Sequence, residues 1–153
     1  MIALILGLCG AGLGVTPALA DPDCEGRDSA TTLTVQVSGM NAARGEVAIT
    51  VYPSDPRKFL APKGKLARLR PKTVAPVTQV CFNLPGPGTY AVAVYHDVNG
   101  DEDFNRSVIG MPTEGFGFSN DAPAKYGLPA FDTVKFQARA GANAIRVKLR
   151  YVK

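Results

Sequence analysis

The sequence predicts an all-β fold, an antiparallel β-sandwich of about seven strands with one long ordered loop at residues 97–130. Three observations favour this fold. Several segments alternate apolar and polar residues with a period of two, turns rich in Gly and Pro separate them, and no segment has the periodicity of a long helix. A small closed barrel is the main alternative architecture.

The first two expected strands are residues 32–37 and 47–52. The stretch between them contains Gly39 and Gly45, so the two strands are expected to form a hairpin. The inward face of the first strand would carry three apolar side chains, Leu33, Val35 and Val37.

The middle of the chain contains an interrupted segment followed by further strands. Residues 59–69 have a helical spacing of apolar residues, but a Pro and a Gly interrupt it, so a loop with one short helical turn is expected. Strands are expected at residues 72–77 and 78–84. Residues 89–96 form the most continuous apolar strand, and a strand that is apolar on both faces belongs in the centre of a packed sheet.

The last third of the chain begins with the long loop. Residues 97–130 have no sustained period, and an ordered loop of this length must bury apolar groups to offset its conformational entropy. Phe116 and Phe118 lie between glycines and are expected to anchor the loop onto the sandwich, with a ligand-stacking surface as the alternative. Two final strands are expected at residues 131–138 and 143–152.

Residues 1–20 have the pattern of a secretory signal peptide. An apolar, glycine-containing stretch is followed by an A-x-A cleavage site at residues 18–20, although no Lys or Arg precedes the stretch. The stretch is short for a membrane span and no basic flank follows it, so a membrane anchor is the weaker alternative. Cleavage would leave residues 21–153 as a single β-sandwich domain that is periplasmic or secreted and has no membrane span.

Cysteine content agrees with export, and the charge distribution excludes one class of partner. Cleavage would remove Cys9 and leave Cys24 and Cys81, an even number in an oxidising compartment. A disulfide between these two residues is expected, with two separate buried thiols as the alternative. The net charge of +4 comes from dispersed basic residues without interleaved aromatic residues, so no nucleic-acid partner is expected.

The start of the long loop carries oxygen-bearing side chains at every second position. Calcium takes about six to eight oxygen ligands, and short Asp and Asn side chains on a curled loop can converge on one ion. The segment is not an EF-hand, because Glu102 and Val108 stand where that loop has Gly and Glu. A solvated acidic turn without a metal is the alternative. The candidate calcium ligands are Asp97, Asn99, Asp101, Asp103, Asn105 and Glu114.

His96, the only His of the chain, lies at the end of the expected central strand. It could transfer protons, but the sequence places no nucleophile beside it, so a hydrogen-bonded strand-end side chain is the favoured interpretation. A single His also excludes a three-His zinc site, and no phosphate-binding or hydrolase motif is present. No catalytic residue is therefore assigned.

Two runs in and before the long loop form a recognisable pair. They are His-Asp-x-Asn-Gly-Asp at residues 96–101 and Gly-Phe-Gly-Phe-Ser-Asn at residues 115–120. Together with residues 88–95 and 109–112, they resemble the exported bacterial domain-of-unknown-function family numbered two-one-four-one, and the resemblance spans essentially the whole mature chain. The resemblance implies a transthyretin-like or immunoglobulin-like β-sandwich that is exported to the periplasm or beyond. It implies no established activity and no established catalytic residues.

These observations combine into one expectation and two alternatives. The expectation is an exported, noncatalytic β-sandwich binding module of unknown ligand, with a candidate calcium-binding loop at residues 97–105 and a surface that contacts an envelope polymer or another protein. The first alternative is a hydrolase that uses His96 with the loop carboxylates. The second is a purely structural envelope domain in which the acidic segment is only a turn and holds no metal.

Overall fold

The computed structural model describes residues 23–124 and 127–152. The predicted signal peptide, residues 1–20, lies outside the described residues. Strands make up most of the regular structure in the described ranges, and the one α-helix assigned there is a single turn. Within these ranges, no helix has both the length and the apolar composition to cross a membrane.

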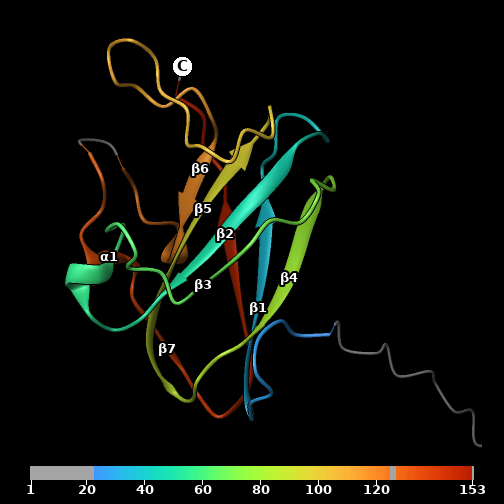
Figure 1. Cartoon of the computed structure of the whole chain (residues 1–153), viewed down its shortest axis with the longest axis vertical. Helices are drawn as coiled ribbons and strands as arrows, with labels where there is room; N and C mark the ends of the chain where they lie inside the picture. Colours follow the sequence, from blue (N-terminus) through green and yellow to red (C-terminus); the bar gives the residue numbers. More distant parts are fainter. Residues whose placement is uncertain (1–22, 125–126, 153) are drawn as a thin grey trace, which may run out of the picture.

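One sheet has three strands in the order β4-β1-β8 (Figure 1). Strand β1 (Thr31–Ser38) pairs antiparallel with β4 (Val77–Asn83) and parallel with β8 (Gly141–Lys148). The sheet is therefore mixed, although most strand pairs of the protein are antiparallel as expected. The predicted inward face of the first strand is confirmed by three fully buried side chains, Leu33, Val35 and Val37.

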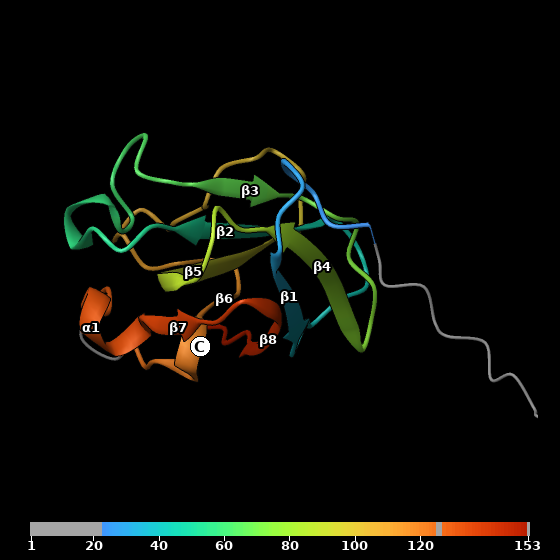
Figure 2. The ribbon, with the colours of Figure 1, turned by 90° about the horizontal axis from the view of Figure 1, so that it is seen from below.

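The other sheet has five strands, with β5 (Gly88–Asp97) at its centre. This strand pairs antiparallel with β2 (Glu46–Tyr52), with β6 (Phe116–Phe118) and, at its start, with β7 (Phe136–Ala138). Strand β3 (Ala67–Leu69) extends the sheet beyond β2, as both views show (Figures 1 and 2). The all-β fold class and the prediction of a central strand near residues 89–96 are confirmed.

The expected hairpin between the first two strands is wrong. Strand β1 lies in the three-stranded sheet and β2 in the five-stranded sheet, so residues 39–45 carry the chain from one sheet to the other. Both strands bury apolar side chains between the sheets, and strands on opposite sides of a sandwich satisfy that requirement as well as neighbours in one sheet. An alternating pattern identifies the buried face of a strand but not its pairing partner.

The expected strand at residues 131–138 is only half a strand. Its first half forms the helix α1 (Phe131–Val134), and the strand β7 begins after it. Phe131 and Val134 are three residues apart, so one helical turn places both side chains on the same side, where they are buried. Burial of two apolar residues at that spacing outweighs the short alternating pattern that suggested a strand.

Regular structure also occurs where loops were expected. The interrupted segment at residues 59–69 ends in β3, and no helix is assigned within it; a 3₁₀ helix, Pro56–Lys58, lies just before the segment. The loop at residues 97–130 contains β6 and a second 3₁₀ helix, Ser119–Asp121. The described residues form eight strands where about seven were expected, because β3 and β6 were not expected and the expected strand at residues 72–77 is absent apart from Val77, the first residue of β4.

Apolar side chains form two clusters, one on each face of the five-stranded sheet. The core between the sheets contains Leu33, Val35, Val37, Val47, Ile49, Val51, Phe82, Leu84, Tyr90, Val92, Val94, Ala138, Val147 and Leu149. On the opposite face, an outer cluster contains Tyr52, Ala91, Phe118, Ala122, Phe131 and Val134. Strand β5 contributes alternate residues to both clusters, so it is buried on both faces.

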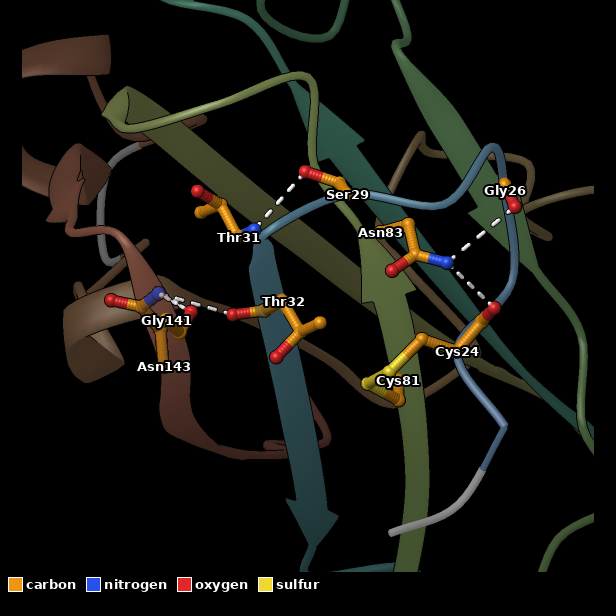
Figure 3. The surroundings of a disulfide bond; sticks show 9 residues. All are labelled: Cys24, Gly26, Ser29, Thr31, Thr32, Cys81, Asn83, Gly141 and Asn143. Atoms are coloured by element: carbon orange, nitrogen blue, oxygen red, sulfur yellow. Dashed lines mark hydrogen bonds between the residues drawn. A yellow bond between two sulfur atoms is a disulfide. The ribbon is translucent and has the colours of Figure 1, made fainter.

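A disulfide between Cys24 and Cys81 ties the start of the described chain to β4, and it confirms the predicted pairing (Figure 3). Hydrogen bonds on both sides of it extend the attachment. The N–H of Glu25 donates to the carbonyl oxygen of Cys81 at 3.0 Å, and the N–H of Asn83 donates to the carbonyl oxygen of Glu25 at 2.8 Å. The Asn83 side-chain amide also donates to the carbonyl oxygen of Cys24 at 2.9 Å (Figure 3).

Removal of this disulfide should lower the free energy of unfolding. The bridge joins two residues that lie 57 positions apart. Because it restricts the conformations of the unfolded chain, it raises the free energy of unfolding by about 4 kcal/mol. We expect Cys24→Ala to lower the free energy of unfolding by about that amount in a urea titration. Reduction of the unmodified protein with dithiothreitol is the matched control and should give a similar loss. An unchanged urea midpoint in both samples would contradict a stabilising bridge.

Candidate functional site

His96, at the end of β5, is fully buried and both of its ring nitrogens have partners. Its Nε2 lies 2.8 Å from the carbonyl oxygen of Arg44, and its Nδ1 lies 2.7 Å from the hydroxyl oxygen of Tyr151. Because a carbonyl oxygen only accepts, Nε2 carries a proton, and in a neutral imidazole Nδ1 then accepts from Tyr151. That hydroxyl in turn accepts from the N–H of Asn41 at 3.1 Å. These contacts join three chain segments and favour the strand-end interpretation of His96 over proton transfer.

Asp97, the next residue, is a fully buried carboxylate that organises the start of the long loop. Its Oδ1 accepts from the N–H of Gly100 at 2.6 Å, and its Oδ2 accepts from the N–H of Glu102 at 2.9 Å. Arg70 forms a salt bridge to the same Oδ2 at 3.0 Å and also donates to the carbonyl oxygen of Glu102 at 2.7 Å. Both carboxylate oxygens are therefore satisfied by donors of the protein.

Glu114 is a second buried carboxylate under the same loop. Its two oxygens accept from the N–H of Val98 at 3.3 Å and from the N–H of Asn105 at 3.1 Å. Burial raises the pKa of Glu114, the two backbone hydrogen bonds oppose the rise, and the charges of Asp97 and Asp101 add to it. This carboxylate holds the two ends of the acidic segment together.

The remaining predicted calcium ligands lie on the exposed side of the segment and bind one another. Asp101 accepts from the side-chain amides of Asn99 at 2.8 Å and of Asn105 at 2.9 Å. It also accepts from the N–H of Asp103 at 3.0 Å. These hydrogen bonds, with that of the Asn105 amide the largest contribution, lower the pKa of Asp101.

The six predicted ligands thus divide between two buried carboxylates and an exposed hydrogen-bonded turn. In the part of the chain that the structure describes, no three His, Cys, Asp or Glu side chains lie close enough together to hold a metal ion. This arrangement resembles the alternative of an Asx-type turn, in which side-chain oxygens accept backbone N–H groups. Calcium binding stays a prediction for experiment.

Aromatic rings attach the long loop to the outer face of the five-stranded sheet. Ring centroids are separated by 5.4 Å between Tyr95 and Phe104, by 5.8 Å between Phe104 and Phe116, and by 6.1 Å between Phe116 and Phe118. Phe118 is buried in the outer cluster, which confirms the predicted anchoring. Most of these contacts are edge-to-face, a geometry that adds about 0.5–1.5 kcal/mol per pair to the area buried.

A pocket of about 520 Å³, which we call the loop pocket, lies between this loop and the outer face of the sheet. Its floor consists of alternate residues from three neighbouring strands, and the loop supplies the opposite wall. The floor residues are Thr50, Tyr52, Ala93, Tyr95, Phe116 and Phe118, and the wall residues include Phe104, Arg106, Met111, Pro112 and Leu128.

Sequence reasoning did not locate the loop pocket. Its lining comes from β2, β3, β5, β6 and the loop, and no local pattern joins these segments. One signal was available in the aromatic residues Phe116 and Phe118, for which a ligand-stacking surface was the alternative to anchoring. The structure places both in the pocket lining, so anchoring and lining are compatible roles.

The chain matches the model of one protein family. The model of the bacterial family DUF2141, described as an uncharacterized protein conserved in bacteria, matches residues 35–146. The chain belongs to this family. The region matched to DUF2141 runs from β1 to β8, so it contains most of both sheets and the whole of the long loop. No curated protein and no solved structure matches the chain.

The buried carboxylate of Asp97 should contribute far more stability than its exposed neighbours in the acidic segment. We expect Asp97→Asn to lower the free energy of unfolding by about 3 kcal/mol, because it leaves the Arg70 charge without its partner. Asp103→Asn, in the same segment but exposed, is the matched control and should change it by less than about 0.5 kcal/mol. Urea titration of both variants provides the comparison, and equal losses would contradict the role of Asp97.

A calcium site in this segment would make the melting temperature of the protein depend on calcium. Added calcium would raise the melting temperature of protein stripped with a chelator, and Asp103→Asn would reduce that rise because it removes a predicted ligand. If calcium leaves the melting temperature of the unmodified protein unchanged, the calcium prediction fails.

Proposed function

We propose that the protein is an exported, noncatalytic binding module that holds a small, largely apolar molecule in the loop pocket. The observation that carries this proposal is the aromatic lining of a pocket of about 520 Å³. Ligand sites in proteins are concave, mostly apolar and about 300–1,000 Å³ in volume, with a few polar groups that orient the ligand. The loop pocket has each of these properties.

The apolar side chains of the loop pocket are incompletely covered by the protein itself. Leu128 and Met111 are 62% and 45% exposed, and Phe104 and Phe116 are half-buried. Exposed apolar area gathered at a concave surface supports a binding role, because a ligand would remove that area from water. Isolated exposed apolar residues would not support this conclusion.

Strand pairing and buried hydrogen bonds hold the floor and the wall of the loop pocket in place. The floor belongs to β-strands that pair along their length, and the loop is attached at its start by the buried carboxylates of Asp97 and Glu114. A pocket built on such supported elements loses little conformational entropy when a ligand binds. This rigidity favours binding at a preformed site.

The geometry around His96 supports binding over catalysis. The hydrolase alternative needs a proton-transfer group that reaches a substrate, whereas His96 is fully buried, has both nitrogens engaged and is not part of the loop-pocket lining. The predicted contact with an envelope polymer or another protein stays a prediction. The exposed apolar tip of the loop, Val108 and Ile109, is the feature that we expect such a contact to use.

A substitution that fills the loop pocket should abolish binding of an apolar probe. We expect the neutral fluorophore N-phenyl-1-naphthylamine to bind the unmodified protein, and Ala93→Phe to raise its dissociation constant by at least about tenfold. Ala93 is a floor residue, so the added ring would occupy the pocket. Ala144→Phe places the same ring on the exposed side of β8 and is the matched control.

Fluorescence titration measures both variants, and their urea midpoints establish that each is folded. If the probe does not bind the unmodified protein, or if Ala93→Phe and Ala144→Phe bind it equally well, the proposed function is contradicted. A purely structural domain is the alternative that the first of these results would favour.

A further inference from the structure

The charge of the loop pocket distinguishes it from an ordinary apolar cavity. Its described lining contains the two cations Arg68 and Arg106 and contains no Asp or Glu. The salt bridges formed within the described residues involve other basic side chains, namely Arg57, Arg70, Lys72 and Lys135. Both guanidinium groups of the pocket therefore lack a carboxylate partner within the described chain.

Arg68 is fixed against the floor of the loop pocket. Its Nε donates to the hydroxyl oxygen of Thr50 at 2.7 Å, across the pairing between β3 and β2. Arg68 also affects the hydroxyl of Tyr52. Burial raises the pKa of that hydroxyl, and the charge and hydrogen bond of Arg68 oppose the rise. A guanidinium fixed through one nitrogen keeps its planar fork oriented for an anion.

Arg106 lies on the opposite wall, which the loop supplies. Its guanidinium carbon is 5.2 Å from the centroid of the Phe104 ring, a cation–π contact, and its Nη1 donates to the carbonyl oxygen of Gly110 at 3.2 Å. Both partners of Arg106 are themselves lining residues of the loop pocket. The positive charge therefore lies next to the aromatic surface rather than apart from it.

We infer that the loop pocket takes an aromatic carboxylate whose rings pack against the aromatic lining and whose carboxylate pairs with Arg68. This inference rests on the proposed function, since it names the class of ligand. A pocket with two cations and no described acid favours an anion over a neutral or cationic molecule. A carboxylate matches the guanidinium fork with two parallel hydrogen bonds, which fixes its orientation as well as its charge.

The lining also selects for flat rings. Five residues of the described lining are Tyr or Phe, namely Tyr52, Tyr95, Phe104, Phe116 and Phe118. Aromatic pairs gain stacking energy beyond the area that they bury, so a ring system gains more here than an aliphatic chain of equal area. A volume of about 520 Å³ accommodates a molecule of two fused rings.

Arg106 contributes to the preference for an anion in a different way from Arg68. It sits on the loop above Phe104 and is not attached to the sheet, so we assign it a general electrostatic attraction rather than the paired contact. The two arginines should therefore have unequal effects on binding.

The test compares two probes of the same shape, 1-naphthoate and 1-naphthamide, by isothermal titration calorimetry at pH 7 with the full chain. We expect naphthoate to bind at least about tenfold more tightly than naphthamide, because only the anion forms charge-assisted hydrogen bonds. Arg68→Gln should remove most of that difference without weakening naphthamide binding. Arg106→Gln should reduce it by about threefold only.

Two further variants control for net charge and for folding. Arg57→Gln removes an exposed charge that lies outside the pocket lining and should leave both dissociation constants unchanged. Arg68→Lys keeps the charge but lacks the planar fork, so it should recover part of the preference for naphthoate. Circular dichroism of each variant establishes that the sheet is intact.

The outcomes separate the two proposals. Equal affinities for naphthoate and naphthamide, or an equal loss of both with Arg68→Gln, would overturn the aromatic-carboxylate inference and leave the proposed function standing. Failure of both probes to bind the unmodified protein would overturn the aromatic-carboxylate inference, and failure of N-phenyl-1-naphthylamine to bind as well would overturn the proposed function.

Discussion

Burial of β5 on both of its faces is the constraint on which the rest of the structure depends. Val92 and Val94 pack into the core between the sheets, and the alternating residues Ala91 and Ala93 face the other way. A sheet in a two-layer sandwich ordinarily leaves its outer face in water, so the apolar outer face of β5 requires a cover. The long loop, α1 and the segment that carries Phe59 and Leu60 supply that cover. Small side chains on this face leave space beneath the loop, and part of that space is the loop pocket.

Ordering the long loop over β5 costs conformational entropy, and hydrogen bonds to buried polar groups offset that cost. The loop contains backbone N–H groups that would lose water on packing, and unpaired buried groups destabilise a fold by about 1–3 kcal/mol each. Asp97 and Glu114 accept four of these N–H groups, and Arg70 neutralises Asp97. The acidic residues thus have a structural explanation that needs no cation.

Local patterns in the sequence predict several of the strands and their buried faces, because side-chain direction alternates along any strand. Residues 32–37 and the central strand follow from such patterns, and the Cys24–Cys81 bridge was expected from the even number of Cys residues after position 20. Pairing does not follow, because β1 and β2 satisfy the same pattern from opposite sheets. The loop pocket does not follow either, because residues as distant as Arg68 and Phe116 meet only after the sheet forms. The contact between Asp97 and Arg70 does not follow either, because the two residues lie 27 positions apart in the sequence.

Native-state hydrogen exchange of the loop amides tests most directly whether the buried carboxylates hold the loop over β5. The N–H groups of Gly100 and Glu102 donate to buried Asp97, whereas that of Asp103 donates to exposed Asp101. We expect Gly100 and Glu102 to exchange as slowly as the amides of β5, and Asp103 to exchange near the rate of an unstructured chain. Exchange of Gly100 and Glu102 as fast as that of Asp103 would contradict this expectation.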